Sequence, residues 1–272
     1  MSDPHRLENL PTIFSPDVYA QRLRRVQQEV RDRGLGGAII GTGPELAYLT
    51  GSWTSSHERL TALVVPPTGH AQLLAPATDA TALAAVGEMN GIELVTWRDG
   101  DNPYALAERA CGSGTVAVGS SLTADHVLRL QQTCGEVVLA TDVLAGAFMV
   151  KGPEEVDQLE FAARAIDRVH AEVPRLLEPG RTEREIAEEL DSLILREHSH
   201  TDFIIVGSGP NGADPHHDYS DRVLRVGDPV VVDLGGTVGA GYHSDCTRTY
   251  VVGGFDNADA EFARAYDTLR RA

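Results

Sequence analysis

The stretch PVVVDLGGTVGAGYHSDCTRTY, residues 229–250, decides how the second half of the chain folds. Its valine run, residues 230–232, is β-branched and is typical of a buried strand that ends at Asp233. The run is followed by four glycines, which favour turns: Gly235, Gly236, Gly239 and Gly241. A second strand-like run, residues 246–252, comes directly after Asp245. The pattern predicts a β-hairpin folded about Gly239.

In a hairpin folded about Gly239, Asp233 and Asp245 are equally far from the turn and face each other. Directly opposed residues have Cβ atoms only ~4.5–5.5 Å apart, and like charges at that distance destabilise the pair. A divalent metal is the simplest neutralising cation, because carboxylates are ligands for Mn, Mg or Zn. Two alternatives stay open: both Asp residues are turn residues in a glycine-rich loop, or a bulge breaks the register.

Composition and charge narrow the class of protein. The 272 residues suffice for one large or two ordinary domains, and 42% hydrophobic residues are typical of a soluble globular protein. The net charge of −17 argues against nucleic acid or anionic membranes as partners. Three scattered cysteines favour a reducing, cytoplasmic setting over a disulfide framework. The polar start, MSDPHRLENLP, predicts no signal peptide, and the absence of a run of ~18 apolar residues predicts no membrane span.

Residues 1–147 alternate between predicted helices and strands after a loosely tethered lead-in over residues 1–15. This alternation predicts an α/β domain with crossover connections. No glycine-rich phosphate fingerprint follows any of its strands, so no organic cofactor is expected. The cluster His57-Glu58-Arg59 is interpreted as an exposed loop, with a functional role as the alternative. We expect no chemistry in this first domain.

Residues 148–272 form the second predicted domain. A long amphipathic helix over residues 154–177 carries His170 one residue past its apolar stripe, which indicates a surface or boundary position. A second helix begins after the capping residue Thr182. A loop rich in Gly, Pro, Asn and Asp then leads to Pro215-His216-His217. The last predicted helix, residues 258–269, reaches the end of the chain without a stop signal, so we expect that a further segment is missing, with an exposed terminal helix as the alternative.

Three segments together resemble one family of enzymes. They are MVKGPEEVDQLEFAARAID (149–167), GPNGADPHHDYSDR (209–222) and the hairpin stretch quoted first. The set is similar to the Xaa-Pro aminopeptidases and Xaa-Pro dipeptidases (prolidases), pita-bread metallopeptidases with a creatinase-like N-terminal domain. The segment GLGGAIIGTGPELAYLTG (34–51) resembles that first domain. The resemblance implies a creatinase-like α/β domain followed by the first half of a pita-bread α+β catalytic domain.

The resemblance also implies an activity and a site. It implies cleavage of Xaa-Pro bonds in peptides by a hydroxide held between two divalent metal ions, Mn, Co or Zn. Asp233 and Asp245 match two of the five metal ligands, with Asp245 bridging the ions, and His216 matches the substrate-side catalytic histidine. Relatives in this family are commonly homodimers.

The sequence departs from the family pattern in its ligand set. The remaining ligands implied by the resemblance are a His and two Glu from a second half of the fold, and only Glu261 follows His243. A chain that is part of a longer product is therefore expected. Two alternatives remain from the sequence: a catalytically inactive pita-bread binding module, and a metal-free creatinase-like hydrolase.

Overall fold

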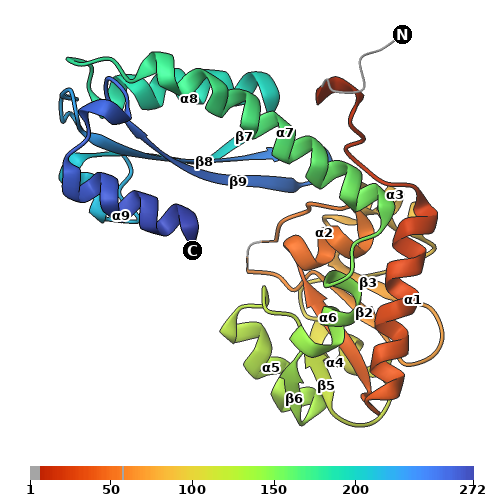
Figure 1. The fold of residues 1–272 in the computed structure, drawn as a ribbon. Helices are drawn as coiled ribbons and strands as arrows, with labels where there is room; N and C mark the ends of the chain where they lie inside the picture. The colour runs from red at the N-terminus through yellow and green to blue at the C-terminus, as the bar shows by residue number, and fades with distance from the viewer. Residues whose placement is uncertain (1–6, 57) are drawn as a thin grey trace. The chain divides into compact units, whose positions relative to one another are not determined.

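The computed structural model describes residues 7–56 and 58–272, and these residues form two compact units (Figure 1). The N-terminal unit comprises Ile13–Lys151. The C-terminal unit comprises Gly152–Ala272 together with residues 7–12. Among the described residues, no helix is both long and apolar enough to cross a membrane.

The N-terminal unit is a three-layer α/β sandwich. Its strands are β1 (Gly37–Gly41), β2 (Ala62–Val65), β3 (Gln72–Pro76), β4 (Glu93–Trp97), β5 (Val116–Val118) and β6 (Val137–Leu139). Its helices are α1 (Pro16–Asp32), α2 (Pro44–Thr50), α3 (Ala80–Asn90), α4 (Pro103–Ala110), α5 (Ala124–Cys134) and α6 (Thr141–Phe148). The strand order is β4-β3-β2-β1-β5-β6, and only β2 runs antiparallel to its neighbours.

Two hydrophobic cores hold this sandwich together, one on each face of the sheet. Helices α1, α2, α3 and α6 bury their apolar residues against one face, and α4 and α5 bury theirs against the other. Because both faces are covered, the strands carry continuous apolar runs such as Ala62–Val65, in which all four residues are buried. The predicted helix–strand alternation is therefore present in the structure.

The C-terminal unit packs two long helices on one face of a three-stranded antiparallel sheet (Figure 1). Its main elements are α7 (Pro153–Leu176), α8 (Glu183–Glu197), β7 (His200–Ser208), β8 (Pro229–Val238), β9 (Tyr242–Val251) and α9 (Ala260–Arg271). Short 3₁₀ turns are η1 (Leu7–Asn9), η2 (Gly209–Ala213) and η3 (Phe255–Asn257). The buried Val230, Val232 and Leu234 point from β8 toward the helices, so the alternate residues of β8 lie on the opposite face.

The start of the described chain differs from the sequence-based prediction of a loosely tethered lead-in. Leu7 and Leu10 pack against the apolar cluster that contains Phe161 and Val238. Gln158, which is buried, donates a hydrogen bond of 2.9 Å to the carbonyl of Pro11. Residues 7–12 are thus fixed on the C-terminal unit by apolar contacts that local sequence could not indicate, while residues 1–6 lie outside the described part.

Candidate metal and substrate site

The hairpin forms as predicted, but its register differs from the prediction. Asp233 is paired with Thr247, and Asp245 is paired with Gly235. The reason is the loop: Val238 pairs with Tyr242, so three residues, 239–241, make the turn and its centre is Ala240 rather than Gly239. The expectation that Asp233 and Asp245 face each other directly is therefore wrong.

The two carboxylates nevertheless lie on the same face of the sheet. Directly paired residues share a face, and so do residues two apart on one strand, which places Asp233, Thr247, Gly235 and Asp245 together. Asp233 and Asp245 are diagonal neighbours, a relation that separates Cα atoms by ~7–8 Å and leaves long side chains within reach. Asp233 is half-buried and accepts a 2.6 Å hydrogen bond from the Thr247 hydroxyl, whereas Asp245 is exposed.

Gly235 and Gly236 lie inside β8 and do not form the turn that the sequence suggested. A Cβ on Gly235 would lie 2.2 Å from the ring of Phe203, and one on Gly236 would lie 2.7 Å from the ring of His198. The strand thus passes between two rings, one on each face, and only glycine leaves room for both. Because Gly235 is paired with Asp245, no side chain from β8 lies directly opposite that carboxylate.

Two buried histidines support β9 on either side of Asp245. His198 Nε2 lies 2.9 Å from the Ser244 hydroxyl, and His170 Nε2 donates a 2.8 Å hydrogen bond to the carbonyl of Cys246. Burial lowers the pKa of both imidazoles, so both act as neutral groups. His170, expected at a surface or boundary, is only 6% exposed. His170 lies on the side of α7 that faces the sheet, and β9 supplies the polar partners that a buried imidazole needs.

The loop that carries His216 returns along the outer edge of β7. The backbone N–H of Val206 donates a 2.8 Å hydrogen bond to the carbonyl of Asp218. Its neighbour Ile205 is paired with Asp233, so the loop lies two strand spacings, about 10 Å, from the strand of Asp233. His216 itself is exposed, and its N–H donates to the side chain of Asp214 at 3.0 Å. The fold thus brings the loop of the predicted histidine alongside the part of β7 that pairs with Asp233.

The base of this loop is fixed by Glu183, a residue that the sequence did not single out. Glu183 is completely buried at the start of α8 and accepts hydrogen bonds from Ser208, Asn211, His217 and Ser220. Burial alone would raise the pKa of Glu183, but the hydrogen bonds from Ser208, His217 and Ser220 outweigh it and lower the pKa to about 2. The carboxylate is therefore charged wherever the protein is folded at ordinary pH.

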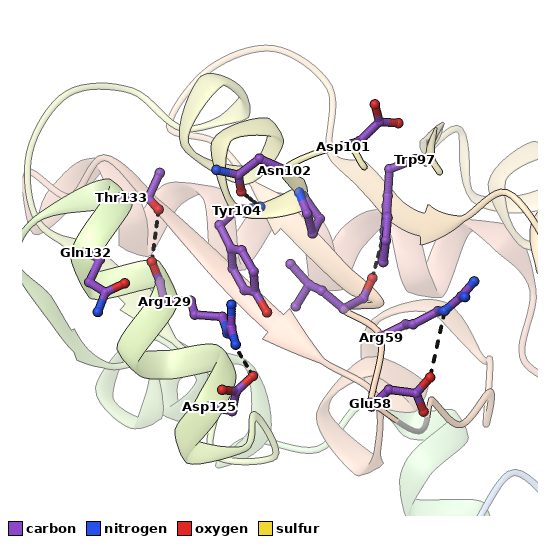
Figure 2. Close-up of a pocket in the computed structure, with 12 residues that line it drawn as sticks. Glu58, Arg59, Trp97, Asp101, Asn102, Tyr104, Asp125, Arg129, Gln132 and Thr133 are labelled. Carbon is purple, nitrogen blue, oxygen red and sulfur yellow. Dashed lines mark hydrogen bonds and ion pairs between the residues drawn. The ribbon is translucent and has the colours of Figure 1, made fainter. Parts of the chain in front are cut away.

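A cavity in the N-terminal unit has a volume of about 560 Å³, but its charged groups already have partners (Figure 2). Arg129 is 2.9 Å from Asp125, and Arg59 is 3.0 Å from Asp99. Glu58 and Arg59 belong to the predicted loop cluster, whose third member, His57, lies outside the described residues. The aromatic wall is Trp97 and Tyr104; the Trp97 indole N–H donates to the carbonyl of Leu60. Among the described residues of this lining, none pairs a nucleophile with a base.

The donor set for a metal is incomplete within the described residues. Over residues 7–56 and 58–272, no group of three or more His, Cys, Asp or Glu side chains converges on one point. Asp233 and Asp245 fit a hard divalent ion in kind and placement, since both offer carboxylate oxygens on one face. They are only two side chains, however, and two carboxylates alone hold a divalent ion weakly.

The sequence matches two protein families that together cover most of the chain. Residues 22–147 match the creatinase/prolidase N-terminal domain, and residues 157–272 match metallopeptidase family M24. The chain is 48% identical over 265 residues to a probable dipeptidase PepE of Mycobacterium tuberculosis, an alignment that covers 95% of this chain and 70% of that protein. These matches show that the chain belongs to metallopeptidase family M24.

Solved structures of this family share the fold. The crystal structure of dipeptidase PepE from Mycobacterium ulcerans superposes with a TM-score of 0.91 at 46% identity, covering 95% of this chain and 70% of that one. A prolidase from Thermococcus sibiricus superposes with a TM-score of 0.78 at 29% identity, covering 93% of this chain and 70% of that one. The predicted resemblance and the predicted fold class, a creatinase-like domain followed by a pita-bread domain, are confirmed.

Proposed function

We propose that this protein is a metal-dependent peptidase that cleaves the bond before proline in Xaa-Pro peptides. The observation that carries the proposal is the placement of Asp233 and Asp245 on one open face of the β8–β9 hairpin. Membership of metallopeptidase family M24, and relatives that are named dipeptidases and prolidases, support it.

Asp233 and Asp245 would hold a pair of divalent ions, with manganese as the first ion to test. When bound, such ions supply Lewis-acid catalysis of amide hydrolysis. The hydrogen bond from Thr247 orients one oxygen of Asp233 and leaves its second oxygen available. The neutral imidazoles of His170 and His198 hold β9 on both sides of Asp245, through the Cys246 carbonyl and the Ser244 hydroxyl, so its carboxylate is presented from a rigid strand.

His216 would donate a hydrogen bond to the oxyanion that develops on the scissile carbonyl. His216 is exposed on a loop about 10 Å from β8, on the far side of β7, so a peptide bound over this face of β7 would reach both His216 and the carboxylates. Because the bond before proline is a tertiary amide, the site must accept the proline ring rather than bind an amide N–H at that position. We further propose a homodimer that works in the cytoplasm.

The proposal is tested by hydrolysis assays on the purified protein with excess Mn²⁺. We expect an Xaa-Pro dipeptide to be cleaved at least about tenfold faster than the matched Xaa-Ala dipeptide, because a site shaped for the ring discriminates by steric fit. An Xaa-Pro-Yaa tripeptide separates dipeptidase from aminopeptidase action. Hydrolysis that survives EDTA, or a preference for Xaa-Ala, would contradict the proposal.

A further inference from the structure

Glu183 occupies an unusual place for an acidic residue in the first turn of a helix. An acidic residue there stabilises the positive N-terminal end of the helix and normally remains in solvent. Glu185 does so: its side chain is exposed and accepts a hydrogen bond from the Thr182 N–H. Glu183 instead has no solvent-exposed surface. A buried carboxylate is costly unless donors surround it, so the surroundings of Glu183 must account for its burial.

Six donor groups from the last residue of β7 and from the loop that follows it converge on this carboxylate. Ser208 donates through its N–H and its hydroxyl at 2.7 and 2.6 Å, and Ser220 does the same at 2.9 and 2.7 Å. The Asn211 amide donates at 3.0 Å, and His217 Nε2 donates at 2.9 Å. Ser208 and Ser220 lie on either side of His216 in the sequence. The Glu183 side chain therefore holds both ends of the segment between them, which we call the His216 loop.

The backbone at Glu183 is joined to the same loop. The N–H groups of Glu183 and Arg184 donate to the carbonyls of Arg222 and Ser220 at 3.1 and 3.0 Å. A helix leaves its first N–H groups without partners inside the helix, and here the loop provides those partners. The start of α8 and the His216 loop are thus fixed to each other by main chain and side chain together.

A second contact closes the loop from the other side. Arg222 forms a two-pronged pair with Asp228 at 2.7 and 3.0 Å, and its Nη1 also donates to the Ser208 hydroxyl at 2.6 Å. Gly209 lies against this pair, where a Cβ would be 2.5 Å from Arg222 Nη2. Its φ of +52° is also a conformation that favours glycine.

We infer that Glu183 is a positioning residue that holds the His216 loop in one conformation against the sheet that carries Asp233. His216 is exposed and lies next to His217, whose imidazole is bonded to Glu183. The position of the exposed histidine is therefore set by its neighbours. The role in catalysis rests on the proposed peptidase function, whereas the holding of the loop does not.

NMR spectroscopy of the full chain tests the holding of the loop. Glu183→Gln keeps the shape and removes the charge, Glu183→Asp keeps the charge, and Glu188→Gln is a matched exposed control on the same helix. We expect one narrow Cε1–H signal for His216 in the wild type and in Glu188→Gln, a broadened or multiple signal in Glu183→Gln, and partial recovery in Glu183→Asp. Ser220→Ala, which removes one donor, should change the signal in the same direction if Glu183→Gln does not fold.

Kinetics test the catalytic consequence. We expect Glu183→Gln to lower kcat for an Xaa-Pro dipeptide about 100-fold with KM and Mn²⁺ affinity nearly unchanged, since a displacement of ~1 Å can cost that much. An unchanged His216 signal in folded Glu183→Gln would overturn the inference that Glu183 holds the loop. An altered signal beside an unchanged kcat would overturn its role in catalysis. A wild type that hydrolyses nothing would instead contradict the proposed function, while the His216 signal would still decide whether Glu183 holds the loop.

Discussion

Replacing Asp245 with Asn is expected to lower kcat/KM for an Xaa-Pro dipeptide by about 1,000-fold or more. The amide keeps the size of the carboxylate but loses the negative charge that a divalent ion requires. Lewis-acid stabilisation of the transition state is worth several kcal/mol, and about 4 kcal/mol corresponds to a factor of 1,000 in rate. The measurement is steady-state hydrolysis with excess Mn²⁺, alongside Mn²⁺ binding to the same samples.

Asp256→Asn is the matched control for this substitution. Asp256 is an exposed carboxylate in η3 of the C-terminal unit, outside strands β8 and β9, so its loss should change neither hydrolysis nor metal binding. Circular dichroism establishes that both variants fold. Full activity in Asp245→Asn, or an equal loss in the control, would show that the carboxylate at position 245 is not the group that matters.

Glu183→Gln is expected to lower the free energy of unfolding of the C-terminal unit by about 3 kcal/mol at pH 7. Hydrogen bonds from Ser208, His217 and Ser220 overcome the effect of burial and lower the pKa of Glu183 from 4.5 to about 2. One pKa unit corresponds to about 1.4 kcal/mol. Because the pKa is lowered by folding, this stability is present above about pH 4.5 and is lost as the pH falls toward 2.

Urea denaturation at pH 7, 5 and 3 measures this difference. Both tryptophans, Trp53 and Trp97, belong to the N-terminal unit, so the C-terminal unit is followed by backbone amide exchange rather than by fluorescence. The gap between wild type and Glu183→Gln should narrow from pH 5 to pH 3, while Glu188→Gln follows the wild type. A gap that stays constant with pH would mean that the charge of Glu183 does not stabilise the fold.

The hairpin illustrates how far sequence reasoning reaches. The valine run, the glycines and the second strand predicted a hairpin, but the length of its loop could not be deduced from four glycines. The three-residue loop moved the partner of Asp233 from position 245 to 247. A shift by two residues preserves the face of each side chain, since strands have a period of two. The two carboxylates therefore share a face, although the predicted register was wrong.

Buried polar contacts between distant segments were beyond the reach of the sequence. Glu183 looks like any acidic residue in a first helical turn, and its partners begin 25 residues later in the chain. His198 contacts Ser244 across 46 residues. Helix α6 was also not predicted, because its eight residues are placed by packing of Val143, Leu144 and Ala147 in the core with α1.

The central claim is that Asp233 and Asp245 together hold the divalent metal ions from one face of the hairpin. Crystals grown with Mn²⁺ and measured near the manganese absorption edge test it most directly, because anomalous scattering locates the ion without assumptions about its ligands. We predict an anomalous peak at coordination distance from oxygens of both carboxylates, about 2.0–2.5 Å. A structure in which Mn²⁺ binds elsewhere, or in which the two carboxylates turn away from each other with no ion between them, would contradict the claim.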